Sequence, residues 1–167
     1  VLTAEGVVYS FGYAEFGALG LGETVESTNV PLRVAIDGVV IGVAARGLHS
    51  AATTDEGRLY TWGYNSAGQL GHGDQTDRSL PSAVASTAQL TVKQVVAGYF
   101  CTLMIDADSA IWITGQLRNG GPQSTTFTRV QFPDTPGLPS PRFISVFAWR
   151  HASLSPLTAP SSVGLRG

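Results

Sequence analysis

Cysteine is almost absent from this chain of 167 residues. Its one cysteine, Cys101, excludes an internal disulfide framework, and the surrounding apolar run 99–105 indicates a buried side chain rather than a reactive thiol. Long hydrophobic runs are missing too, because no apolar run approaches the roughly 18 residues of a membrane-spanning helix. We therefore expect neither a disulfide-rich scaffold nor a membrane-spanning helix.

Charge is also scarce. Only 13% of the residues are charged, with 10 Lys and Arg, 12 Asp and Glu, and a formal net charge of −2. The basic residues are scattered and form no dense stripe of the kind that neutralises phosphates, so nucleic-acid binding is not expected from this segment. The hydrophobic content of 43% suffices for a buried core, while 20 glycines and short apolar runs favour many strands joined by tight turns.

The chain does contain a tandem repeat with a period of about 51 residues. The strip 6–13 reappears at 57–64, and the same spacing relates the glycine-rich strips that follow. The matched residues are Tyr9 with Tyr60, Phe11 with Trp62, Gly12 with Gly63, Gly17 with Gly68, Leu19 with Leu70, Gly20 with Gly71 and Gly22 with Gly73.

A second strip shows the same period. Residues 47–50 are aligned with 98–101 and then with 149–152, which places His49 opposite Phe100 and His151. The third copy of the first strip has decayed, since Thr114 stands where Trp62 stood. We expect repeats at about 1–46, 47–97 and 98–147, the start of a fourth at 148–154, and a flexible tail at 155–167.

The repeat has the strand content of a β-propeller blade. Alternating side chains in 59–62 fit a strand with two unlike faces, and the acidic, glycine-containing turn before it closes a hairpin. The short β-branched or aromatic runs 39–45, 92–97 and 143–148 are interpreted as fully buried strands. About four strands fit each period, which is typical of a propeller blade. Gly17, Gly20 and Gly22 are expected to let neighbouring blades approach closely.

The pattern from 57 to 73, with its Gly-Gln-Leu-Gly-x-Gly ending, resembles the repeat of the regulator of chromosome condensation family, and strip 47–50 belongs to the same repeat. This resemblance implies an all-β fold, a seven-bladed β-propeller, of which about three blades are present. Because an unclosed propeller exposes strand edges, we expect the chain to belong to a longer protein or to complete its ring with another polypeptide.

The repeat also removes most candidates for chemistry. The strips 17–22 and 68–73 have the order G-x-x-G-x-G rather than that of a dinucleotide-binding loop, and they recur with the blades. The histidines show no metal-ligand spacing, and no G-x-S-x-G nucleophile motif is present. We expect no enzyme activity, no metal and no cofactor. A structural role in the repeat is assigned to Gly12, Gly17, Gly20, Gly22, His49, Tyr60, Trp62, Gly63, Gly68, Leu70, Gly71, Gly73 and His151.

Positions where the repeat fails are the candidates for partner binding. The loop 116–126 interrupts the third repeat, the loops 23–29 and 74–80 are polar, and the strap 132–142 is rich in proline. In addition, Trp149 replaces the glycine of the second strip. The candidate partner-binding residues are Gln116, Arg118, Asn119, Trp149 and Arg150.

The strip 149–151 is similar to one in a light-absorbing member of the family. In that member the strip follows a glycine and recurs in several blades, whereas here it follows Ala148 and occurs once. An interface or core aromatic is therefore the favoured interpretation of Trp149.

Two functions are predicted. The first is a protein-interaction scaffold within a larger assembly, with other proteins or the rest of its own propeller as partners. The second, implied by the resemblance, is guanine-nucleotide exchange on a Ran-type small GTPase, although no wedge for opening a nucleotide site is identifiable in this segment. The sequence names neither the partner nor the compartment.

Overall fold

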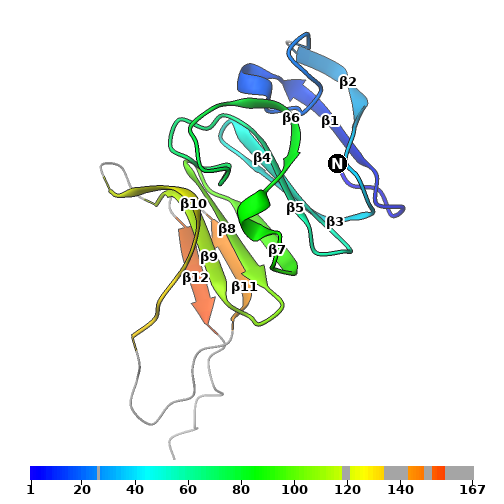
Figure 1. Ribbon diagram of the computed structural model, residues 1–167. Helices are drawn as coiled ribbons and strands as arrows, with labels where there is room; N and C mark the ends of the chain where they lie inside the picture. The colour runs from blue at the N-terminus through cyan, green and yellow to red at the C-terminus, as the bar shows by residue number, and fades with distance from the viewer. Residues whose placement is uncertain (26, 118–120, 134–142, 149–151, 157–167) are drawn as a thin grey trace, which may run out of the picture.

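The computed structural model describes residues 1–25, 27–117, 121–133, 143–148 and 152–156. Within these ranges the chain forms twelve strands and two single turns of 3-10 helix, η1 (Glu15–Gly17) and η2 (Ala85–Thr87). The strands form four antiparallel sheets that follow one another along the molecule (Figure 1). In the described part of the chain, no helix has the length and apolar character needed to cross a membrane.

Two of the sheets are complete four-stranded blades. The first blade has the order β3-β4-β5-β6, with β3 (Val40–Arg46), β4 (His49–Thr54), β5 (Leu59–Gly63) and β6 (Arg78–Ala83). The second blade has the order β10-β9-β8-β7, with β7 (Val92–Ala97), β8 (Cys101–Asp106), β9 (Ile111–Gln116) and β10 (Gln123–Arg129). Each is a meander of consecutive strands, as expected for a propeller blade.

The other two sheets have two strands each and lie at opposite ends of the molecule (Figure 1). The N-terminal pair is β1 (Val8–Tyr13) with β2 (Ser27–Val34), and the C-terminal pair is β11 (Phe143–Ala148) with β12 (Ala152–Pro156). By their place in the repeat, β1 and β2 are the outer strands of a blade, whereas β11 and β12 are the inner strands of one. The prediction of an all-β, partial propeller is confirmed.

The blades differ from the sequence repeats in phase. The expected boundary near residues 46 and 47 lies inside a sheet, between β3 and β4, and that near residues 97 and 98 lies between β7 and β8. A tandem repeat can be divided at any phase. The expected repeats begin between the first and second strands of a blade, so each repeat contributes strands to two neighbouring blades.

The hydrophobic core lies between blades as well as within them. Ala51 and Leu59 of the first blade share one buried cluster with Val95 and Met104 of the second. This cluster forms because β7 packs across β3 and β4. Burial of β-branched and aliphatic side chains at this interface stabilises both sheets at about 25 cal/mol per Å² of apolar surface.

Glycine-rich loops, called clasp loops below, link each sheet to the next by hydrogen bonds. The backbone carbonyl of Ala18, in the loop after β1, accepts hydrogen bonds from Ser50 Oγ (2.9 Å) and Trp62 Nε1 (3.0 Å) of the first blade. One repeat later, the carbonyl of Gln69 accepts from Thr102 Oγ1 at 2.6 Å and that of Gly68 from Thr114 Oγ1 at 2.8 Å. The decayed position Thr114 thus also donates across the blade boundary, although its acceptor Gly68 lies one residue before Gln69, the counterpart of Ala18.

Close approach in these loops depends on glycine. A Cβ added to Gly20 would lie 2.7 Å from Trp62 Nε1, and one added to Gly71 would lie 2.5 Å from the Phe127 ring. Both glycines also have positive φ, at 71° and 80°, which side-chain-bearing residues rarely adopt.

Two of the strands expected to be fully buried are not. The exposed face of β3 includes Ile41 and Val43, and β7 exposes Lys93. The prediction is wrong for both strands because the two faces of an inner strand differ in exposure. A face is buried only where a neighbouring blade covers it. The side chains of the third run, 143–148, lie outside the described burial.

The alignment of the second strip is wrong by one residue. Val40 pairs with Thr54 at the base of the first hairpin and Val92 pairs with Asp106 in the second, so equivalent positions here are 52 apart rather than 51. The counterpart of His49 is therefore Cys101 and not Phe100. The cause is a pair of length changes. Pro31 and Pro81 are 50 apart, because the second repeat is one residue shorter before them, and the connection that contains η2 then adds two residues, which gives 52 at β7.

Candidate functional site

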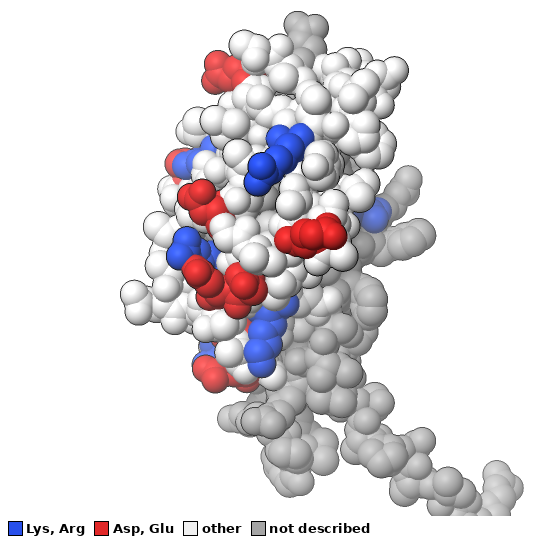
Figure 2. Space-filling model, turned by 90° about the vertical axis from the view of Figure 1, so that its right-hand side faces the viewer, with Lys and Arg blue, Asp and Glu red and all other residues white. Residues whose placement is uncertain are grey.

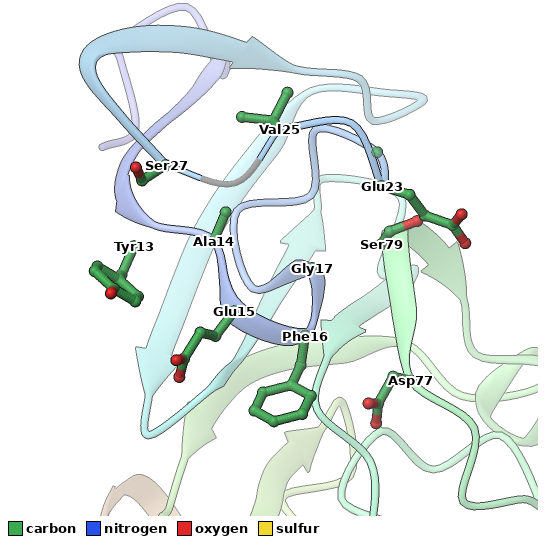
Figure 3. Close-up of a pocket in the computed structure, with 11 residues that line it drawn as sticks. Tyr13, Ala14, Glu15, Phe16, Gly17, Glu23, Val25, Ser27, Asp77 and Ser79 are labelled. Carbon is green, nitrogen blue, oxygen red and sulfur yellow. The ribbon is translucent and has the colours of Figure 1, made fainter.

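A pocket of about 560 Å³ lies where the N-terminal half blade meets the first complete blade (Figure 3). Residues of the half blade within 13–17 and 22–25, together with Ser27, form most of its wall, and Asp77 and Ser79 of the first blade complete it. In Figure 3 the side chains of Glu15, Phe16 and Asp77 lie at one end of the pocket, and Glu23 and Val25 lie at the other. The lining residues are Tyr13, Ala14, Glu15, Phe16, Gly17, Gly22, Glu23, Val25, Ser27, Asp77 and Ser79.

The pocket carries negative charge without a neutralising cation among the described residues. Glu15, Glu23 and Asp77 line it, and none of them forms an ion pair with a described Lys or Arg. The nearby Arg78 binds Asp74 with both guanidinium nitrogens, at 2.9 and 3.0 Å. The hydrogen bonds from Arg78 lower the pKa of Asp74 to about 2, so this pair remains charged and its cation is not free to neutralise the pocket.

Two aromatic rings stand at the rim of the pocket. Tyr13 is 75% exposed and Phe16 is 47% exposed, so both rings are accessible to a partner. The Phe16 ring packs against Tyr64 with a centroid distance of 4.6 Å and an interplanar angle of 50°. Phe16 also has φ of 55°, a left-handed conformation that is strained for a bulky residue and recurs at binding sites.

Beside the pocket, one repeat lacks an asparagine that the next one has. In the first blade, Asn65 is fully buried, its Nδ2 donates to the backbone carbonyls of Asp74 (3.0 Å) and Thr76 (3.1 Å), and its Oδ1 accepts from Leu70 N. These bonds hold the loop 70–77 against the blade. The equivalent residue of the half blade is Ala14, which has no polar side chain. Position 14 therefore provides no such tether for residues 22–25, beside which the pocket lies.

One of the five predicted partner-binding residues lies in the described part of the chain. Gln116 ends β9, is half-buried, and donates from Nε2 to the carbonyl of Gly121 at 2.9 Å. The amide of Gln116 thus already has a hydrogen-bond partner within the chain. Arg118, Asn119, Trp149 and Arg150 lie outside the described residues and remain predictions, as does the repeat residue His151.

The two described histidines are held in inter-strand networks. Thr102 Oγ1 donates to the carbonyl of Gln69, so His49 Nε2, 3.0 Å from the same oxygen, must donate to it. Burial lowers the pKa of His49 to about 4. His72 Nε2 lies 3.0 Å from Thr61 Oγ1, and its pKa is lowered to about 4, chiefly by partial burial and next by the charge of Arg78.

Neither metal nor thiol chemistry is indicated by the described residues. They contain no group of three or more His, Cys, Asp or Glu placed to hold a metal ion. Cys101 is buried, and desolvation raises the pKa of its thiol to about 11, which leaves it protonated and unreactive at neutral pH. Lys and Arg are interspersed with Asp and Glu on the face seen in Figure 2, without a basic stripe.

Part of this pocket is predictable from the sequence. The loops 23–29 and 74–80 are among the segments expected to escape the repeat, and the structure brings Glu23, Val25 and Ser27 of the first together with Asp77 and Ser79 of the second. The sequence does not predict that the segment 13–17 lines the pocket, because its pattern places it inside the repeat. A signal for it exists in the alignment, where Phe16 replaces the small Ala67 and Ala14 replaces Asn65.

Consecutive four-stranded sheets, joined by glycine-rich clasps at a fixed period, define a β-propeller built of tandem repeats. Models of the regulator of chromosome condensation (RCC1) repeat match residues 5–53 and 56–105, and a second model of that repeat matches 40–69. The chain belongs to the RCC1 repeat family, as its sequence predicts.

Curated relatives share this repeat over part of their length. The chain is 39% identical to the ultraviolet-B receptor UVR8 of Arabidopsis thaliana over 121 residues, which cover 71% of this chain and 27% of the receptor. It is 37% identical over 121 residues to the human E3 ubiquitin-protein ligase HERC2, covering 68% of this chain and 2% of the ligase. The chain thus spans about a quarter or less of these two relatives.

Solved structures show the same fold. Human WBSCR16 matches with a TM-score of 0.76 and 24% identity, over 87% of this chain and 39% of that protein. Prp20p of Saccharomyces cerevisiae matches with a TM-score of 0.77 and 22% identity, over 93% of this chain and 40% of that protein. Prp20p is described as binding Gsp1p and histones.

Proposed function

We propose that this chain is a protein-interaction module of a larger assembly and that it binds its partner through the pocket beside Phe16. The observation that supports this proposal is the combination of two exposed rings with three carboxylates that have no cationic partner among the described residues. RCC1-repeat propellers commonly mediate protein interactions. The partner segment that fits is a peptide that presents Lys or Arg next to an apolar side chain.

The chemistry of the pocket favours such a segment. A cation over an exposed aromatic face gains about 0.5–1 kcal/mol. Pairing of a guanidinium with an exposed carboxylate adds about 0.2–1 kcal/mol. An apolar neighbour can pack on the Phe16 ring, which is already held by Tyr64 and loses little freedom on binding.

The binding site can be tested with a labelled peptide that has two arginines, one on each side of a leucine. We expect the double variant Phe16→Ala with Asp77→Asn to weaken its binding about fivefold to tenfold, because a ring contact and a carboxylate are lost together. The carboxylate of Asp77 accepts a hydrogen bond from Asn65 N at 2.7 Å, and the amide oxygen introduced by Asp77→Asn can still accept it, which preserves the fold. Fluorescence anisotropy measures the affinity.

Glu5→Gln is the matched control for charge, because Glu5 is exposed in a turn outside the pocket. It should leave the affinity unchanged. Equal binding by the double variant and the wild type would contradict the proposal, and an equal loss in the Glu5 control would reduce the effect to net charge.

A second variant tests the origin of the pocket. We expect Ala14→Asn to provide the tether that Asn65 provides in the next blade and to draw residues 22–25 inward. The peptide should then bind more weakly while the melting temperature stays the same or rises, since hydrogen bonds are gained. Anisotropy and circular dichroism measure the two quantities. An unchanged affinity would show that the open loop is not what binds the peptide.

Nucleotide exchange on a Ran-type GTPase is the second candidate function. The support for it is the likeness in fold to Prp20p, which is described as binding Gsp1p. Release of a fluorescent guanine nucleotide from a Ran-type GTPase discriminates the two candidates. Acceleration by the protein that contains this chain would favour exchange, whereas peptide binding without acceleration would favour the interaction module.

A further inference from the structure

Apolar side chains continue from the pocket along one end of the blades. In both complete sheets the second strand begins beside the end of the third strand, so the turns before β4 and β8 share this end with the residue that follows β5. These positions carry Leu48, Tyr99 and Tyr64. Tyr99 is 52% exposed, and Leu48 and Tyr64 are half-buried. All three adjoin strands of the two complete four-stranded sheets.

Contacts between neighbours connect these residues into a row that starts at the pocket. The Phe16 ring packs against the Tyr64 ring at 4.6 Å between centroids. The backbone N–H of Tyr64 donates to the carbonyl of Leu48 at 2.9 Å. Gly47, next to Leu48, lies against Tyr99, since a Cβ added to Gly47 would be 3.0 Å from the Tyr99 carbonyl oxygen. The row Phe16, Tyr64, Leu48 and Tyr99 thus crosses from the half blade to the second complete blade.

The row presents side chains rather than a free strand edge. The carbonyl of Leu48 already accepts from Tyr64 N, and the carbonyl of Phe100 accepts from Gln116 N at 2.7 Å. The Phe100 ring contacts the Tyr99 ring edge-on, at 5.4 Å between centroids and an interplanar angle of 62°. A partner segment would therefore be recognised by packing on rings and not by adding a strand to a sheet.

A proline-rich segment has the properties that such a row requires. A polyproline II helix makes no internal hydrogen bonds, and it is recognised when its prolines dock on aromatic-lined surfaces. The pocket at the start of the row adds Glu15 and Asp77, which have no cationic partner among the described residues. Rings beside carboxylates match a proline-rich segment that carries an arginine at one end.

We propose that the partner segment is proline-rich, with its arginine in the pocket and its prolines packed along the row as far as Tyr99. This proposal rests on the proposed function, because it takes the pocket beside Phe16 as the anchor. The bound segment would contact three consecutive sheets, since Phe16 belongs to the half blade, Tyr64 to the first complete blade and Tyr99 to the second. A single repeat would therefore not provide the whole site.

Fluorescence anisotropy with matched labelled peptides and the full chain tests this proposal. The short peptide is the leucine flanked by arginines that tests the pocket. The long peptide adds Pro-x-x-Pro-x-x-Pro at either end, which extends it by roughly 22 Å at about 3.1 Å per residue. The control peptide adds glycine and serine over the same length. We expect the long peptide to bind about fivefold more tightly than the other two, because a preformed helix loses little freedom on binding.

Tyr99→Ala locates the gain on the row. This variant should abolish the advantage of the long peptide and leave the short peptide unaffected, because Tyr99 does not line the pocket. Tyr99→Phe keeps the ring and should keep most of the advantage. Since the Tyr99 side chain is half exposed, both variants should melt like the wild type, and unchanged binding of the short peptide confirms that they are folded.

The outcomes separate this inference from the function on which it rests. A long peptide that binds no better than the short peptide or the glycine-serine control would overturn the inference and leave the pocket as the interaction site. An advantage that survives Tyr99→Ala would overturn it as well. If the short peptide does not bind at all, the proposed function fails and this inference fails with it.

Discussion

Replacing Trp62 by alanine is expected to lower the free energy of unfolding by about 3–5 kcal/mol. The indole is buried in the cluster with Tyr60 and Ala52, and its Nε1 donates to the carbonyl of Ala18 across the blade boundary. Truncation removes this packing, leaves a cavity and deprives a partly buried carbonyl of a donor. Because Trp62 joins two sheets, the loss should affect the half blade as well as the first complete blade.

Phe11→Ala is the matched control, because Phe11 holds the same place in the preceding repeat and is half exposed. It should cost about 1 kcal/mol or less. Urea unfolding of the two variants, followed by tryptophan fluorescence for Phe11→Ala and circular dichroism for both, measures the difference. A similar loss of unfolding free energy in both variants would contradict this account. It would show that the position in the repeat, rather than burial between blades, determines the cost of truncation.

The stability of the fold should fall when the pH drops from 6.5 towards 4. Burial lowers the pKa of His49 from 6.5 to about 4, so the unfolded chain binds a proton at this residue more readily than the folded chain does. The contribution of neutral His49 is complete above pH 6.5 and is lost as the pH falls towards its folded-state pKa. At pH 4 the loss amounts to about 3 kcal/mol. His72 acts in the same direction, since its pKa is also lowered.

His49→Gln isolates this contribution. A glutamine amide can still donate to Thr102 Oγ1 but does not titrate, so the variant should be less sensitive to pH between 6.5 and 4 even if its stability at neutral pH is lower. Chemical denaturation at a series of pH values measures the slopes. An equally steep slope in the variant would assign the pH dependence to other groups. Asp74 would contribute little to it, because the stability that this carboxylate provides is lost between its ordinary pKa of 3.8 and its folded-state pKa of about 2, below this range.

The blades could be predicted from the sequence because their signal is local and repeated. The pattern at 57–73 places the third strand, the clasp loop and the glycines together, and the structure forms them as one unit. Exposure could not be predicted in the same way. Val43 and Val95 stand in similar apolar runs, yet only Val95 is buried, because a neighbouring sheet covers it. That neighbour is a property of the assembly rather than of the local sequence.

The pocket was only half predictable for a related reason. The polar loops that escape the repeat predict part of its lining. The replacement of Asn65 by Ala14 at the equivalent position can be interpreted only when the hydrogen bonds of Asn65 are known. The longer connection before β7 also shifts the counterpart of His49 by one residue, from Phe100 to Cys101. A short strip with few distinctive residues does not determine its own alignment.

The proposed binding site lies at the boundary between the N-terminal half blade and the first complete blade. The pocket beside Phe16 is the proposed site for a basic, partly apolar segment.

Binding of the arginine-containing peptide at the pocket beside Phe16 can be mapped residue by residue, from the amide chemical shifts of the full chain during a titration. We expect shifts concentrated at 13–17, 22–25 and 77–79, with saturation at one peptide per chain and little change in β8 or β9. Shifts confined to other surfaces, or a complete lack of change at the pocket while the peptide binds, would contradict the proposed interaction site.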